Sequence, residues 1–99
     1  MKQISQRFYM QGQSWNFERI VEQAGRKLRV AIRRNAYDDQ SSVHGYALDP
    51  LQLKWNLLVD RPIMGAACQK ASYVRSNEPI APFEQDAKSV LEELAKILA

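Results

Sequence analysis

The sequence predicts an α+β domain in which about four antiparallel strands form a meander that a C-terminal α-helix covers on one face. Two hairpin patterns in series and one amphipathic segment at the C-terminus are the observations behind this prediction. A chain of 99 residues buries enough surface to form one core without disulfides or metals. We therefore predict a single α+β domain spanning residues 1–99.

The first predicted hairpin comprises residues 14–22 and 27–35. SWNFERIVE and KLRVAIRRN are rich in strand-forming residues, and the intervening QAGR supplies a turn glycine. A two-residue loop at Ala24-Gly25 sets Arg34 opposite Trp15 and puts Arg33 and Arg34 on opposite faces, because side chains alternate along a strand. The same register gathers the apolar side chains on one face, namely Trp15, Phe17, Val21, Leu28, Val30 and Ile32.

The second predicted hairpin joins residues 42–48 to residues 52–60 through the turn dipeptide Asp49-Pro50. In QLKWNLLVD the apolar residues alternate with polar ones, which predicts one apolar face made of Leu53, Trp55, Leu57 and Val59. A two-residue loop then sets Tyr46 opposite Leu53 and His44 opposite Trp55. His44 is therefore expected on the apolar face.

The stretch IRRNAYDDQSS, residues 32–42, joins the two hairpins. The predicted core residues have even numbers both in the strand before this stretch and in the strand after it. To keep them on one face, the chain needs a loop with an odd number of residues, or a bulge, within residues 37–41. Asn35, Asp38, Asp39 and Ser41 are residue types that such a turn favours. Tyr37, Asp38 and Asp39 are also a candidate contact surface, because loops often carry function.

The C-terminal segment PFEQDAKSVLEELAKILA predicts a helix with acidic residues in its first turn and Lys96 near its end. Its apolar residues fall along one stripe at helical spacing: Phe83, Ala87, Val90, Leu91, Leu94, Ile97 and Leu98. The sequence does not assign residues 63–80 to one type of secondary structure. MGAACQKASYV fits a short helix or a strand, and SNEPIAP is typical of a loop.

The charge is unevenly distributed along the chain, although the formal net charge is only +3. Eight basic and two acidic residues precede Asn35, whereas six basic and nine acidic residues follow from there on. Such a chain can hold a basic sheet against an acidic helix or present a cationic patch to a polyanion. The candidate polyanion contacts are Arg19, Arg26, Lys27, Arg29 and Arg33. The alternative is a solvated face with cross-strand pairs such as Lys27 with Glu22.

The sequence contains no recognisable catalytic or phosphate-binding motif. His44 could join Tyr37, Asp38 and Asp39 in a proton-transfer group, but a histidine at the edge of the core is the more common outcome. The lone Cys68 has no partner for a disulfide or a metal site. We therefore predict no enzyme, no cofactor and no metal site. Without a signal peptide or a long apolar run, a cytoplasmic protein without membrane contact is expected.

The run I-R-R-N-A-Y-D-D-Q-S at residues 32–41, followed by a strand and by Trp55, resembles short uncharacterised proteins encoded by phages and plasmids. The resemblance covers about residues 30–55 and implies no known activity. It implies an accessory protein of a mobile genetic element, of the kind that binds a host or phage protein or nucleic acid.

We expect a small protein-binding module. One form of such binding is a homodimer that forms through an edge strand or through the face bearing Ile20 and Leu58. Nucleic-acid binding by the basic hairpin is the alternative. A small-molecule pocket between sheet and helix near His44 and Tyr46 comes third.

Overall fold

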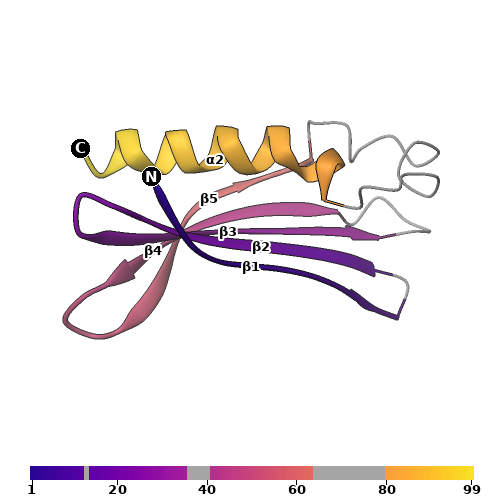
Figure 1. The fold of residues 1–99 in the computed structure, drawn as a ribbon, viewed down its shortest axis with the longest axis horizontal. Helices are drawn as coiled ribbons and strands as arrows, with labels where there is room; N and C mark the ends of the chain where they lie inside the picture. Colours follow the sequence, from indigo (N-terminus) through magenta and orange to yellow (C-terminus); the bar gives the residue numbers. More distant parts are fainter. Residues whose placement is uncertain (13, 36–40, 64–79) are drawn as a thin grey trace.

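In the described part of the chain, five antiparallel strands follow one another across the sheet in chain order, and a helix lies along one face (Figure 1). The structure is a computed structural model that describes residues 1–12, 14–35, 41–63 and 80–99. The elements are β1 (Lys2–Gln11), β2 (Ser14–Gln23), β3 (Arg26–Asn35), β4 (Ser42–Asp49), β5 (Lys54–Arg61), the 3-10 helix η2 (Ala81–Phe83) and α2 (Glu84–Ile97). The predicted α+β class is confirmed. Strand β1 is an addition that the sequence analysis did not identify.

Strand β1 is an edge strand that pairs with β2 and sets Phe8 opposite Phe17. A bulge interrupts the pairing between Gln3 and Ser5. Phe8 packs against the core, and its ring centroid lies 6.1 Å from that of Phe83. The strand is otherwise mostly polar and exposed, which is typical of a sheet edge.

The hairpin of β2 and β3 has the predicted register. Trp15 pairs with Arg34 and Glu22 pairs with Lys27. Ala24 and Gly25 have φ angles of 53° and 76°, and a turn with two left-handed residues matches the right-handed twist of the strands. Arg34 is 3% exposed, with its guanidinium carbon 5.7 Å from the centroid of the Trp15 ring. The predicted separation of Arg33 from Arg34 is thereby confirmed.

The predicted register of the hairpin of β4 and β5 is wrong. Tyr46 pairs with Leu57 and His44 with Asp60, because the loop comprises four residues, 50–53, rather than two. Asp49 closes this longer loop: its Oδ1 accepts hydrogen bonds from the amides of Leu51 at 2.8 Å and of Gln52 at 3.2 Å. Its carbonyl oxygen also accepts a hydrogen bond from the amide of Leu53.

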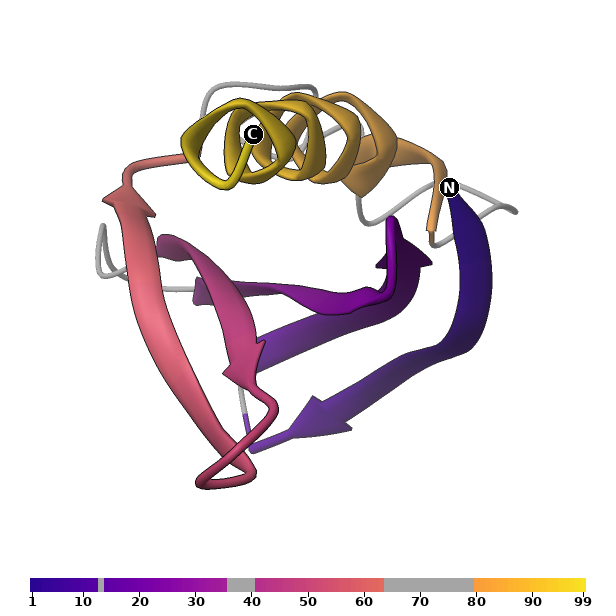
Figure 2. The ribbon, with the colours of Figure 1, turned by 90° about the vertical axis from the view of Figure 1, so that its left-hand side faces the viewer.

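The predicted apolar face of β5 is also wrong, because a bulge at Leu58 divides it. Val59 pairs with Gly45 and is 5% exposed on the face that α2 covers, whereas Leu57 pairs with Tyr46 on the other face. Helix α2 packs on β3, β4 and part of β5, and the end of this hairpin curves away from it (Figure 2). Leu53 is consequently 76% exposed rather than buried.

The pairing of β3 with β4 contradicts the expected parity of the junction. Ile32 pairs with Val43 and Val30 with Gly45, so even core positions face odd ones. The expected odd-length loop is therefore wrong, since this register needs an even number of residues between the paired positions. The small and apolar residues of β4 lie under the helix, which turns His44 to the opposite face. Tyr37, Asp38 and Asp39, the candidate loop surface, lie outside the described residues, as does Cys68.

The core lies between the sheet and α2. Phe83 ends η2 and stacks on Phe17 with ring centroids 5.5 Å apart and an interplanar angle of 12°. The buried apolar residues are Phe17, Val21, Leu28, Val30, Ile32, Val43, Ala47, Val59, Phe83, Ala87, Val90, Leu91 and Leu94. The predicted burial of Ile97 is wrong: it is 49% exposed, because in the last turn Leu98 packs against the core instead. Within the described ranges, no helix is long and apolar enough to cross a membrane.

Candidate functional site on the open face of the sheet

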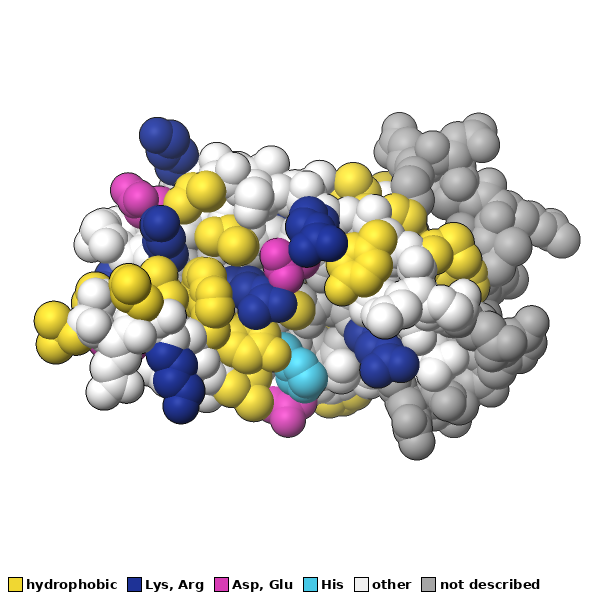
Figure 3. All heavy atoms as spheres, turned by 90° about the horizontal axis from the view of Figure 1, so that it is seen from below, with side chains coloured by type: hydrophobic (Ala, Val, Ile, Leu, Met, Phe, Trp, Pro, Cys, Tyr) yellow, Lys and Arg dark blue, Asp and Glu magenta, His cyan; other side chains and the backbone are white. Residues whose placement is uncertain are grey.

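The face of the sheet opposite α2 is not covered by any described element, and we call it the open face (Figure 3). Alternation along the paired strands assigns its side chains. They include Lys2, Arg7 and Tyr9 on β1, Asn16, Glu18, Ile20 and Glu22 on β2, Lys27, Arg29, Ala31 and Arg33 on β3, Ser42, His44, Tyr46 and Leu48 on β4, and Trp55, Leu57 and Asp60 on β5. Aromatic, cationic and small side chains are thus interspersed on one surface.

Arginine and aromatic side chains contact each other on the open face. The guanidinium carbon of Arg29 lies 5.0 Å from the ring centroid of Tyr46 and 5.9 Å from that of Trp55. On the edge strand β1 of the same face, the guanidinium carbon of Arg7 lies 4.9 Å from the ring centroid of Tyr9. Contacts of this kind contribute about 0.5–1 kcal/mol each at exposed sites. They hold the side chains in place while leaving both charge and ring surface accessible.

His44 belongs to the same surface and lies next to Tyr46 and Asp60. Its Nε2 is 3.1 Å from Oδ1 of Asp60, and its Nδ1 is 3.4 Å from the hydroxyl oxygen of Tyr46. The two rings meet edge to face, with centroids 6.2 Å apart. The expected small-molecule pocket between sheet and helix near His44 and Tyr46 is therefore wrong, because both side chains lie on the open face.

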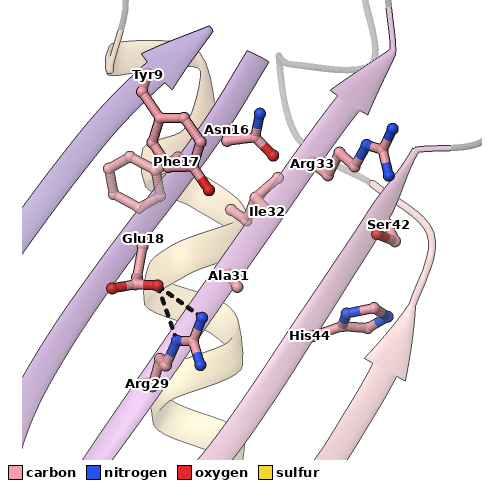
Figure 4. A pocket seen from close by; sticks show the side chains of 10 residues that line it. All are labelled: Tyr9, Asn16, Phe17, Glu18, Arg29, Ala31, Ile32, Arg33, Ser42 and His44. Carbon is pink, nitrogen blue, oxygen red and sulfur yellow. Dashed lines mark hydrogen bonds and ion pairs between the residues drawn. The ribbon is translucent and has the colours of Figure 1, made fainter. Parts of the chain in front are cut away.

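A shallow pocket of about 270 Å³ opens at the centre of this face, and we call it the Ala31 pocket (Figure 4). Ala31 lies in the middle strand and pairs with Glu18 on one side and with His44 on the other. Arg29 and Arg33 flank it along β3, and Tyr9 lines the pocket from β1. Because Ala31 carries only a methyl group, the longer side chains around it form walls.

The five predicted polyanion contacts do not share one face. Lys27, Arg29 and Arg33 lie on the open face, whereas Arg19 and Arg26 lie on the side that α2 covers. The guanidinium of Arg19 forms an ion pair with Glu84 at 2.6 Å, and its Nε donates to Oε1 of Gln6. The hydrogen bond from Arg19, together with its charge, lowers the pKa of Glu84 below the ordinary value of 4.5, although burial opposes this.

The open face still carries more positive than negative charge. Its described residues include five cationic side chains and three carboxylates. Glu18 neutralises Arg29 through an ion pair of 2.7 Å. Arg33 forms no ion pair with any described residue, and its Nε donates only to the hydroxyl of Ser14 at 3.3 Å. A cationic group is thus available at the end of the Ala31 pocket.

Three residues of this surface were missed at the level of sequence. Arg7 and Tyr9 were missed because β1 was not predicted, although Phe8 at the centre of KQISQRFYMQ could have indicated a strand with one apolar contact. Trp55 was assigned to the apolar face. The adjacent pair Leu57-Leu58, which breaks the alternation in QLKWNLLVD, is the signal that a bulge could have explained.

No three of the His, Cys, Asp and Glu side chains in the described ranges lie close enough together to hold a metal ion. The chain matches no protein-family model, and no curated protein and no solved structure matches it. Its function must therefore be inferred from the chemistry of the open face.

Proposed function

We propose that this protein binds single-stranded nucleic acid on the open face of its sheet and that it is not an enzyme. The observation that carries the proposal is the bulge at Leu58, which turns Trp55 to the open face beside Arg29 and Tyr46. Unpaired bases stack on aromatic rings and guanidinium planes, and each stacked base contributes about 1–3 kcal/mol. A surface with such groups on an open antiparallel sheet suits a flexible strand with exposed bases.

The charge of the open face supports a polyanionic partner. Lys27, Arg29 and Arg33, three of the predicted contacts, lie along one strand, and Arg7 adds a fourth cation on β1. Phosphates that these groups neutralise would release counterions, so the affinity should fall as the salt concentration rises. The polar residues between the cations keep this face hydrated when no partner is bound.

The test is a fluorescence-anisotropy titration with labelled single-stranded and double-stranded oligonucleotides at low and near-physiological salt. We expect Trp55→Ser to lower the affinity for single strands roughly tenfold, because one stacking contact is lost. The variant Arg33→Ala should also reduce the slope of log affinity against log salt by about 0.7, the value for one phosphate of a single strand, because no described carboxylate pairs with Arg33. Lys88→Ala removes one charge from the exposed surface of α2 and is the matched control that should leave binding unchanged.

Absence of binding to either kind of oligonucleotide at low salt would refute the proposal. Equal losses in Lys88→Ala and in the open-face variants would also refute it, because attraction would then come from the overall charge rather than from this surface. If the protein prefers the duplex to the single strand, base stacking on the aromatic residues is excluded, and only contacts to phosphates explain the binding.

A second candidate function is protein binding through the tip of the hairpin of β4 and β5. Leu51 is 93% exposed and Leu53 is 76% exposed, and Leu57 and Leu58 follow on the same hairpin at 50% and 40%. Asp49 holds this loop with its side chain and its carbonyl oxygen, and Leu53 adopts a left-handed φ of 54°. An ordered loop that presents leucines to solvent suits contact with another protein, including a second copy of this chain. The resemblance of residues 32–41 to phage and plasmid proteins is consistent with both functions.

Sedimentation velocity over a range of protein concentrations tests the homodimer form of this candidate. We expect the sedimentation coefficient of the unaltered protein to rise with concentration and that of the variant Leu51→Ser with Leu53→Ser to stay at the monomer value. Gln52→Ser alters the same loop at a polar position and is the control. A monomer at every concentration would refute self-association through the tip.

A further inference from the structure

The Ala31 pocket has a polar wall whose orientation is fixed. Glu18, the residue opposite Ala31 on β2, has a side chain that is only 18% exposed. Arg29 contacts one oxygen of this carboxylate twice, with Nε 3.0 Å and a terminal nitrogen 2.7 Å from Oε2 (Figure 4). The other oxygen, Oε1, accepts no hydrogen bond from the described part of the chain. One acceptor is therefore held in place and left unused.

The remaining walls of the pocket supply hydrogen-bond donors and a cation, Arg33, that no described carboxylate pairs with. Asn16 and Ser42 lie across β3 from each other, in the row next to that of Ala31, and both line the pocket. Arg33 lies in this same row and forms no ion pair with a described residue. The floor is the methyl group of Ala31, which leaves room for a planar ring. Donors, one acceptor and a small apolar floor together match the edge and the face of a nucleobase.

We infer that the Ala31 pocket binds one nucleobase that carries an exocyclic amino group, with Glu18 as the acceptor for that group and Arg33 as the contact for the adjoining phosphate. This inference rests on the proposed binding of single strands and adds a preference among bases. A carboxylate accepts a hydrogen bond from the amino group of cytosine, whereas thymine presents a carbonyl oxygen at that position and would be repelled. A bare anion in the pocket is disfavoured for the same reason, since Glu18 forms part of its wall.

Arg29 is a positioning residue for Glu18. Because both of its contacts go to Oε2, it fixes the orientation of the carboxylate and leaves Oε1 without a hydrogen bond from the described residues. It also lies against the rings of Tyr46 and Trp55, which fixes the guanidinium from the other side. The pocket is thus connected to the aromatic surface on which the next base would stack.

The experiment compares oligo-dC with oligo-dT of equal length by anisotropy, using the unaltered protein and the variant Glu18→Gln. We expect the unaltered protein to bind oligo-dC at least about fivefold more tightly, as a hydrogen bond to a charged group allows. In Glu18→Gln this ratio should fall to about one, because the amide can also donate to the carbonyl oxygen of thymine. We expect the absolute affinity to rise in this variant, because Arg29 loses its ion pair with a carboxylate, so the ratio is the quantity to measure. Glu22→Gln removes a carboxylate from the same face outside the pocket and should preserve the ratio.

A second variant, Ala31→Leu, fills the pocket without changing any charge. It should remove the preference for oligo-dC while leaving the salt dependence unchanged. Binding of both oligonucleotides with equal affinity by the unaltered protein would overturn the inference but not the proposed function. An unchanged ratio in Glu18→Gln or Ala31→Leu would overturn it as well. Failure to bind either oligonucleotide would overturn both.

Discussion

Gly45 and Ala31 are two small residues in neighbouring strands, and they face opposite sides of the sheet. A Cβ atom added to Gly45 would lie 2.7 Å from Cγ1 of Val90 and 3.0 Å from Cβ of Val59, so the helix packs directly on the backbone there. No described element covers Ala31, and its methyl group forms the floor of a pocket. The small size of Gly45 is a requirement of packing. Packing against a described element does not require the small size of Ala31, and its short side chain leaves the pocket on the open face.

The aromatic residues of the two faces differ in the same way. Phe83 and Phe17 stack inside the core and are almost completely buried. Trp55 and Tyr46 lie against Arg29 at the surface and remain partly exposed. The covered face therefore holds the fold together, and the open face leaves similar rings partly exposed to solvent.

The largest expected effect separates these two sets of rings. Phe83→Ala should lower the free energy of unfolding by about 3–5 kcal/mol, because it leaves a cavity between Phe8, Phe17 and the helix. Trp55→Ser should cost only about 1 kcal/mol, as for a partly exposed side chain. Urea unfolding followed by circular dichroism measures both. Similar losses in the two variants would show that Trp55 belongs to the core and would remove the basis of the proposed function.

The next effect separates the two small residues. Gly45→Ala should lower the free energy of unfolding by about 1–3 kcal/mol, because the added methyl group overlaps with Val90 and Val59. Ala31→Leu should change it by no more than about 0.5 kcal/mol, since its side chain extends into solvent. The same urea titrations give both values. A large loss in Ala31→Leu would mean that the pocket is too tight to accept a ring.

The sequence predicts the fold where local rules and packing agree. In the hairpin of β2 and β3, the dipeptide Ala24-Gly25 sets a tight turn, and alternation then fixes every pair up to Trp15 and Arg34. The C-terminal helix follows equally from its apolar stripe. The turn dipeptide determines the pairing of the hairpin, and the apolar stripe determines which face of the helix is buried. Both could therefore be predicted from residues close in sequence.

The hairpin of β4 and β5 could not be predicted in this way. Its loop is closed by the side chain of Asp49, and its faces are exchanged by a bulge at Leu58. Asp49-Pro50 is compatible with a two-residue loop as well as with the four-residue loop observed, and the bulge becomes evident only from the pairing of Val59 with Gly45. The bulge places Trp55 on the open face, and the pairing of β4 with β3 places His44 there. The candidate site was therefore predicted only in its cationic strand, at Lys27, Arg29 and Arg33.

The smallest expected effect is a pH-dependent change in stability, which should distinguish an arginine on the covered face from one on the open face. On the covered side, Arg19 lowers the pKa of Glu84 through a hydrogen bond and through its charge. A carboxyl group with a lowered pKa in the folded state stabilises the fold above its ordinary value of 4.5, and this contribution is lost as the pH falls below that value. The contribution stays below about 1 kcal/mol, because the side chain of Glu84 is half exposed.

We therefore expect Arg19→Gln to be less stable than the unaltered protein at neutral pH, with a difference that shrinks as the solution is acidified below pH 4.5. Arg33→Gln removes an equal charge from the open face, where no described carboxylate pairs with it. Its difference should stay flat across the same range. Urea midpoints measured from neutral to acidic pH give both curves. A pH-dependent loss in Arg33→Gln would mean that this guanidinium also serves the fold, and that it is less available to a phosphate than the open face suggests.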